Sequence, residues 1–202
     1  SHEVSGRSKL LEKQQSIKSA DDIVNPFPGD QAPDVVIFMV INSQQIEDFM
    51  LCAVSREGEG TSFQTYVSTL PATTTVLITS TCAPSAILSI KELINRECGG
   101  HNSAGIPGMV DAPVSGGPIK ARNGQLSIMA SGTVEEAKCS IKERLSNATL
   151  PVYLQVLCAL SNSGESLFLF PPLVGSETIV GSGSMAKTMH QLLAGVHIAT
   201  SA

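Results

Sequence analysis

The stretch Met109–Gly132, MVDAPVSGGPIKARNGQLSIMASG, decides how the rest of the chain is interpreted. An apolar, strand-like entry runs into a proline and then into Ser115-Gly116-Gly117. This order predicts a loop at the end of a buried strand that presents a hydroxyl group together with bare backbone amides. Such a loop can hold an anion. Without a second signal, an ordinary turn would be the better interpretation of a Ser-Gly-Gly segment.

A second stretch, Gly181–Lys187 (GSGSMAK), supplies that signal. Its two glycines permit a tight entry into a helix and a close approach to a neighbour. From Ser184 onward the spacing predicts a helix with an apolar face formed by Met185, Met189, Leu192, Val196 and Ala199. The adjacent face carries a cation and two hydrogen-bonding groups that we expect to point in one direction, and it comprises Lys187, His190, Gln191 and Gly195.

The two stretches together resemble a family signature. DAPVSGG followed by an A-x-x-G-x-L segment, with GSGSMAK downstream, is similar to the β-hydroxyacid dehydrogenases, the family of 3-hydroxyisobutyrate and tartronate semialdehyde dehydrogenases. Two motifs in the expected order and at about the expected distance are far more specific than either alone. The run HQLLAGVHIA at 190–199 resembles the subgroup of L-threonate and related four-carbon acid dehydrogenases.

The resemblance implies a reaction and a set of site residues. The family oxidises the CH–OH group of a small hydroxy acid, here of the 3-hydroxyisobutyrate or threonate type, by hydride transfer to NAD or NADP. Lys187 would be the general acid and base, because desolvation can lower a lysine pKa toward neutrality. The substrate carboxylate would lie on Ser115, Gly116 and Gly117. Gln191 would orient the substrate in place of the asparagine that most of the family has.

Other interpretations of this helix remain open. A lone lysine on an amphipathic helix is normally a solvated surface charge, and only the motif around Lys187 reverses that expectation. His190 is a second candidate for proton transfer, although a hydrogen-bonded structural histidine is the better interpretation. A metal site formed by His190 and His197 lacks further ligands, so we expect no metal.

The corner between a strand and a helix is the first candidate for a cofactor contact. The run at 34–41 (DVVIFMVI) is continuously apolar, which predicts a parallel strand covered on both faces, with a helix over 44–54 after it. A ligand sits at such a corner in open α/β sheets. By resemblance, Met39, Val40 and Asn42 flank the adenine side of the cofactor. A plain strand end is an equally good interpretation.

A turn after the next strand is the second candidate. The strand is expected at 75–78, and the sequence STCAP that follows it matches the S-T-x-x-P turn of the family. The family places this turn at the nicotinamide ribose of the cofactor. Ser80 and Thr81 are therefore expected to contact NAD or NADP.

Strands and helices alternate through the remainder of the chain. After a loop at 56–65 and the strand at 75–78, we expect a helix at 85–97, strands at 109–112 and 126–130, and a helix at 134–145. This alternation predicts parallel βαβ units and an α/β fold with a Rossmann-like parallel sheet. The part at 147–175 is the least regular, and an added hairpin and a damaged strand are both open there.

The beginning and the end of the chain suggest missing units. Residues 1–6 resemble the second strand of the family, a helix is expected at 8–18, and no G-x-G-x-x-G precedes them, so the first strand and its glycine loop are expected to be absent. The chain stops at Ala202, inside what would be the long interdomain helix. We therefore expect an NAD(P)-binding domain of the 6-phosphogluconate dehydrogenase type at 1–176 and the start of an all-helical domain at 177–202. A catalytically inactive truncated remnant, or an interaction protein on the same fold, is the alternative function.

Composition excludes several classes of partner. The net charge of −5, without a cluster of Lys and Arg, argues against nucleic acid. The apolar runs are too short to span a bilayer and no signal-peptide core is present, so we expect no membrane and a cytoplasmic location, with a mitochondrial one left open. Five cysteines without C-x-x-C spacing are expected to be free thiols, of which Cys82 could be reactive. The resemblance also implies a homodimer.

Overall fold

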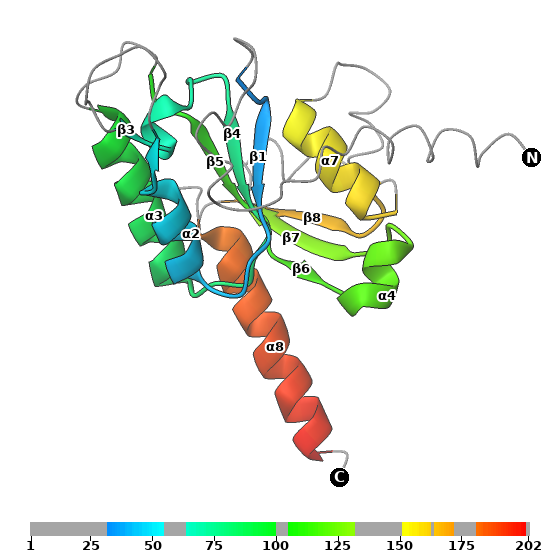
Figure 1. Cartoon of the computed structure of the whole chain (residues 1–202). Coiled ribbons are helices and arrows are strands. Elements are labelled where there is room, and N and C mark those ends of the chain that lie inside the picture. Colours follow the sequence, from blue (N-terminus) through cyan, green and yellow to red (C-terminus); the bar gives the residue numbers. More distant parts are fainter. Residues whose placement is uncertain are drawn as a thin grey trace, which may run out of the picture.

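The computed structural model describes residues 32–54, 64–99, 105–131, 151–162, 164–171 and 181–200. The elements are, in chain order, β1 (Val35–Phe38), α2 (Ser43–Met50), β2 (Ala53–Val54), β3 (Gln64–Thr65), η2 (Val67–Thr69), β4 (Thr75–Ile78), α3 (Pro84–Gly99), β5 (Gly108–Asp111), β6 (Val114–Ser115), α4 (Gly117–Arg122), β7 (Ser127–Ser131), α7 (Val152–Leu160), β8 (Leu167–Phe170) and α8 (Ser182–Thr200). Figure 1 shows β1, β4 and β5 between α2 and α3 on one side and α7 on the other. This is the α/β architecture expected from the sequence.

Two three-stranded sheets form the centre of the fold. The first has the order β1-β4-β5, and both of its pairs are parallel. The second has the order β6-β7-β8, in which β7 and β8 are parallel but β6 and β7 are antiparallel. The parallel pairing confirms the Rossmann-type sheet, and the antiparallel β6 is a departure from the expected all-parallel arrangement.

One continuous segment connects the two sheets. β5 ends at Asp111, and β6 begins three residues later, after a proline. The amide of Ala112 still donates to the carbonyl of Ile78 in the first sheet at 2.8 Å, whereas the carbonyl of Pro113 already accepts from the amide of Met129 in the second at 3.1 Å. The chain therefore passes from one sheet into the other within two residues.

The central strand β4 separates two hydrophobic clusters. Val76 and Ile78 point to the cluster that contains the buried faces of α2 and α3, whereas Leu77 points to the cluster that contains α7. All three side chains are fully buried. Successive side chains of a strand point to opposite faces, so a run of apolar residues is required where both faces are covered.

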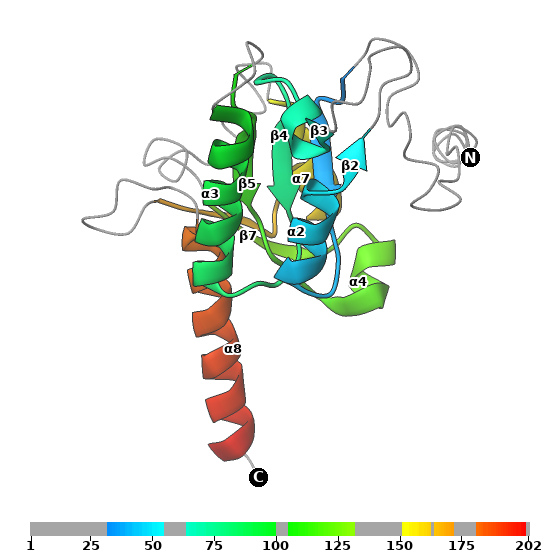
Figure 2. The same ribbon diagram turned by 60° about the vertical axis from the view of Figure 1, so that its left-hand side comes forward.

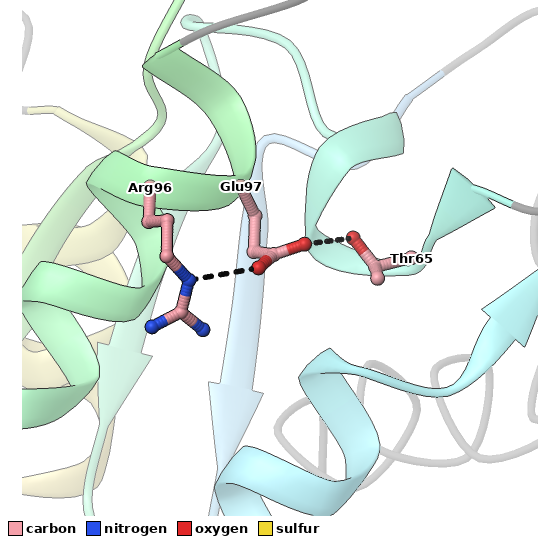
Figure 3. Close-up of polar contacts among 3 residues, drawn as sticks. All are labelled: Thr65, Arg96 and Glu97. Carbon is pink, nitrogen blue, oxygen red and sulfur yellow. Dashed lines mark hydrogen bonds and ion pairs between the residues drawn. The ribbon is translucent and has the colours of Figure 1, made fainter.

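The helix α3 matches its prediction closely. Its apolar stripe is buried as expected and consists of Ile87, Ile90, Leu93 and Ile94, each of which contributes about 1.5–3 kcal/mol by burial. Its last turn is tied to β3, because the hydroxyl of Thr65 donates to Glu97 at 3.3 Å while Arg96 donates to the other carboxylate oxygen at 3.1 Å (Figure 3). The ends of the helix lie within two residues of those predicted.

The first strand and helix are shorter than predicted. β1 covers four residues of the expected 34–41, and Ile37 is 47% exposed, so the prediction of a strand covered on both faces is wrong in the described part of the chain. β1 has a described partner, β4, on one edge. The predicted helix to Val54 ends at Met50 because residues 53–54 pair instead with 64–65, which belong to the loop predicted at 56–65.

The irregular part of the sequence contains regular elements. The apolar run at 152–160 is the helix α7, which begins after Pro151 and buries Leu154, Leu157 and Cys158 at helical spacing. The run at 167–170 pairs along its whole length with β7. The second run is therefore an intact strand rather than part of a hairpin. The strand and helix expected at 1–18 and the helix expected at 134–145 lie outside the described residues.

The last helix, α8, begins two residues before the predicted start. Its first turns contact β7 and β5, and the helix then leaves the body of the molecule (Figures 1 and 2). Among the described residues, no helix has the length and hydropathy that crossing a bilayer requires.

Candidate functional site

The carboxyl ends of β1 and β4 are joined by a small hydrogen-bond network. The carbonyl of Phe38 accepts from the amides of Thr79 at 2.9 Å and Ser80 at 3.2 Å. The hydroxyl of Ser80 in turn accepts from the amide of Val40 at 2.8 Å. Because parallel strands end at the same edge of a sheet, this network brings together two of the predicted cofactor segments.

The surface beside this network is apolar and exposed. Met39 is 64% exposed and Ile41 is 85% exposed, while Ser80 beneath them is buried. Thr81 is exposed on the adjoining turn. Asn42 has a structural task, because its side chain accepts from the amide of Gln45 at 3.0 Å and so caps α2. The predicted contacts thus lie on one edge, with Asn42 at the start of the helix.

The Ser-Gly-Gly loop lies next to the same edge. The amide of Val114 donates to the carbonyl of Thr79 at 3.3 Å, and Ser115 follows as the half-buried last residue of β6. Gly116 has φ 139° and Gly117 has φ 68°, a region that favours glycine. Both glycines are exposed. The two glycines are thus exposed where β6 ends and α4 begins, and the anion-binding role of this segment stays a prediction.

The two sequence motifs meet through Asp111 and Ser184. The buried carboxylate of Asp111 accepts from the amide of Ser184 at 2.7 Å and from its hydroxyl, also at 2.7 Å. The backbone amide of Gly181 donates to it as well. Amides at the start of a helix have no partner within the helix, so a carboxylate there completes their hydrogen bonding and interacts favourably with the helix dipole. We call this arrangement the Asp111–Ser184 clasp.

Burial dominates the electrostatics of the clasp. Desolvation raises the pKa of Asp111 to about 6, although the hydrogen bonds from Ser184 and Gly181 oppose the shift. Burial, together with the nearby Asp111 carboxylate, also raises the pKa of the Cys82 thiol. A raised pKa disfavours the thiolate, so the structure gives no support to the expectation of a reactive Cys82.

Gly183 lets α8 approach the sheet closely. A Cβ atom at this position would lie 2.7 Å from the carbonyl oxygen of Asp111 and closer still to that of Met129. Both obstacles are backbone atoms, which cannot rotate away. The glycine is therefore required by packing between the helix and the strands β5 and β7.

Lys187 lies one turn beyond the clasp and is buried, with 6% of its surface exposed. Desolvation lowers the pKa of its ammonium group. Among the described residues, no ion pair or hydrogen bond of its side chain is present. Burial disfavours the charged ammonium relative to the neutral amine, which is the property expected of a proton-transfer group.

Gln191 and His190 differ from Lys187 in their surroundings. Both are exposed, as are Met189, Leu192 and Leu193, because this part of α8 extends beyond the sheets. The lysine therefore lies against the body of the molecule, whereas the two polar side chains that were expected to point with it are open to solvent. No hydrogen bond between Gln191 and the Ser-Gly-Gly loop is found within the described ranges.

Sequence reasoning missed Asp111 and Ser184, although both lie in the quoted motifs. A usable signal was the acidic residue at the end of an apolar strand, since a buried carboxylate needs donors. The glycine-rich helix start offers such donors.

Cys52, Cys82, Cys98 and Cys158 are free thiols, and Cys139 lies outside the described residues. Within the described ranges, no group of three or more His, Cys, Asp or Glu side chains could hold a metal ion.

Comparisons with known proteins bear on the family to which the chain belongs. Residues 5–149 match the family described as the NAD binding domain of 6-phosphogluconate dehydrogenase. The L-threonate dehydrogenase of Pectobacterium atrosepticum is 30% identical over 196 residues, which are 96% of this chain and 51% of that protein. The L-threonate dehydrogenase of Escherichia coli strain CFT073 is 40% identical over 94 residues, 46% of this chain and 24% of that protein.

The fold has a counterpart among solved structures. A putative oxidoreductase from Mycobacterium avium 104 superposes with a TM-score of 0.54 at 17% identity, over 99% of this chain and 54% of that one. This similarity concerns the fold. The chain thus spans about half the length, or less, of the relatives that it matches.

Proposed function

The chain belongs to the family of NAD-binding domains of 6-phosphogluconate dehydrogenase, within the β-hydroxyacid dehydrogenases, and from this we propose that it serves an NAD(P)-dependent oxidation of a small hydroxy acid. The substrate would be of the threonate or 3-hydroxyisobutyrate type. In this proposal residues 1–176 form the cofactor-binding domain, and residues 177–202 begin the helical part that completes the site.

The burial of Lys187 is the observation that carries the proposal. Its side chain is buried, has a lowered pKa, and lies one turn after the clasp that joins both motifs. Oxidation of an alcohol requires a group that takes the hydroxyl proton, and the reverse reaction requires one that returns it. A desolvated lysine can do both near neutral pH. We therefore assign Lys187 as the general acid and base.

The described residues fit a nicotinamide dinucleotide at the carboxyl edge of the first sheet. Met39 and Val40 offer an exposed apolar surface for a base, and Ser80 and Thr81 lie on the adjoining turn. Asn42 stands at the helix start beside them. When bound, the cofactor would accept or donate the hydride. These residues would bind and orient it.

The Ser-Gly-Gly loop would hold the substrate carboxylate. Two consecutive glycines with positive φ expose backbone amides, and Ser115 adds a hydroxyl group. The contact between Val114 and Thr79 keeps the loop beside the proposed cofactor turn. In this arrangement Gln191, on the exposed part of α8, would orient the substrate.

Calorimetric titration of the chain with NAD(H) and NADP(H) tests the proposal. Binding tighter than about 1 mM, which is roughly −4 kcal/mol, is the expected result. Lys187→Ala should bind the cofactor equally well but lose turnover of L-threonate and 3-hydroxyisobutyrate. A folded sample that binds neither cofactor would contradict the proposal for this chain.

An interaction protein on the same fold is the second candidate. It is favoured by the adjacent exposed apolar side chains Met189, Leu192 and Leu193 on α8. The titration separates the two candidates, because an interaction protein has no need of a nicotinamide cofactor. Binding of NAD(H) or NADP(H) would favour the dehydrogenase.

A further inference from the structure

One face of α8 carries the contacts that attach it to the sheets. Gly183, Ser184 and Lys187 are three or four residues apart, so they lie on the same side of the helix in successive turns. Gly183 faces the backbone of β5 and β7, and Ser184 faces Asp111. Lys187 follows on this face and is buried.

We propose that Asp111 is a positioning residue for Lys187, because its hold on Ser184 fixes the first turn of α8 and thereby keeps the lysine in its buried place. The role assigned to Lys187 is that of the proposed function, on which this inference rests. Asp111 itself contributes no atom to the reaction in this scheme.

The geometry of the clasp supports a positioning role. Both carboxylate oxygens accept from the same residue, one from its amide and one from its hydroxyl, so the turn can neither rotate nor slide without losing a hydrogen bond. The backbone of Asp111 is held by a second residue, Ser131 of β7. The hydroxyl of Ser131 donates to the carbonyl of Asp111 at 2.9 Å and accepts from its amide at 3.2 Å. Asp111 in β5 is thus also attached to β7 through Ser131.

In this proposal the clasp affects the pKa of Lys187 by keeping its side chain buried, and not through the charge of Asp111. Burial is the cause of the lowered lysine pKa, and no ion pair with Asp111 is present in the described part of the chain. A neutral side chain with the same shape should therefore preserve the effect. Asp111→Asn retains an acceptor for the amide of Ser184 and a donor for its hydroxyl, whereas Asp111→Ala retains neither.

The ionisation of Lys187 itself is the measurement that tests this proposal. The pH dependence of its labelling by an amine-reactive reagent, followed at this lysine by mass spectrometry, reports its pKa. In Asp111→Ala and in the milder Ser184→Ala, we expect the pKa to rise toward the ordinary lysine value. Asp111→Asn should keep it low. The conservative variant thus provides the rescue.

Thr188→Val serves as the matched control. Its hydroxyl donates to the carbonyl of Ser184 at 2.9 Å, so this variant also removes a hydrogen bond from α8, but it leaves the clasp intact. The labelling profile of Lys187 should not change in Thr188→Val. An equal shift in Thr188→Val and Ser184→Ala would overturn the proposal, as would an unchanged profile in a folded Ser184→Ala.

The proposed function and the proposal about the clasp can fail independently of each other. Labelling is measured on the chain without substrate or cofactor, so it does not depend on turnover. A chain that binds no NAD(P) but shows the expected shift in Ser184→Ala and the rescue in Asp111→Asn would support the clasp and contradict the dehydrogenase alone. A chain that binds cofactor but shows an unchanged labelling profile of Lys187 in Ser184→Ala would support the dehydrogenase and contradict the positioning role of Asp111.

Discussion

Asp111 and Ser184 are 73 positions apart in the chain, yet the carboxylate of one holds both the amide and the hydroxyl of the other. This relationship joins the strand motif to the helix motif. It also places the carboxyl group where burial disfavours its charged form more than the hydrogen bonds from Ser184 and Gly181 favour it. The stability of the fold, and in our proposal the position of Lys187, therefore depend on one buried carboxyl group.

The first prediction concerns the pH dependence of stability. The pKa of Asp111 is raised from 3.8 to about 6, so the folded state binds this proton more tightly than the unfolded state does. Its contribution to stability is complete below about pH 4 and is lost as the pH rises through about 6, a change of about 3 kcal/mol. Denaturation at pH 4 and pH 7 should show Asp111→Asn close to the wild type at the lower pH and more stable at the higher one. If the free energies of unfolding of the wild type and Asp111→Asn change equally between pH 4 and pH 7, the prediction is contradicted.

The second prediction concerns Gly183. In Gly183→Ala the new methyl group meets the backbone carbonyls of Asp111 and Met129, so α8 must move away from the sheets. Such overpacking typically costs about 1–3 kcal/mol. We expect a lower denaturation midpoint and faster labelling of Lys187. Gly99→Ala is the matched control, because a Cβ atom there meets nothing within 4 Å. Equal stability of the two variants would refute this role of Gly183.

The third prediction separates stability from activity at Lys187. Burial lowers its pKa, so protonation of this amine is less favourable in the folded state than in the unfolded state and weakens the fold. Lys187→Met should raise the free energy of unfolding at neutral pH, and the gain should shrink as the pH rises toward the ordinary pKa of lysine. Any NAD(P)-linked turnover should disappear in the same variant. Lys120→Met, on the exposed face of α4, provides the control. A destabilised Lys187→Met at pH 7 would contradict the prediction.

The fourth prediction concerns the exposed side chains of α8. Met189 is 53% exposed, Leu192 60% and Leu193 67%, which is unusual for adjacent large apolar residues. The isolated 202-residue chain should therefore self-associate with increasing concentration in sedimentation experiments and bind an apolar dye. Leu192→Glu should reduce both signals. His190→Glu adds the same charge at an exposed polar position and should change them less; a monomer without dye binding at high concentration would speak against the prediction.

The sequence predicted the helices and strands whose apolar pattern is decided locally. The stripe of α3 and the run of β4 lie where their periodicity indicated, because each meets a hydrophobic cluster along its whole length. The prediction for 44–54 was wrong at its end. Pairing between 53–54 and 64–65 is a contact across a loop, which periodicity in one segment does not report.

The site could be predicted only in part, for a similar reason. Motifs indicated Lys187 and the Ser-Gly-Gly loop, and the structure adds that this lysine is buried while Gln191 is not. Burial depends on where α8 leaves the sheets, and that is decided by the contacts of Gly183 and Asp111. No local pattern in the helix contains this information.

The passage of the chain from β5 into β6 has a consequence for the way the molecule opens. Residues 108–115 pair with β4 on one side and with β7 on the other, so neither sheet can separate without breaking hydrogen bonds of this segment. A local fluctuation in one sheet therefore leaves the hydrogen bonds between this segment and the other sheet intact. Its amide protons at Ala112 and Asp111 should be among the slowest to exchange with deuterated solvent, at a rate that reports global unfolding.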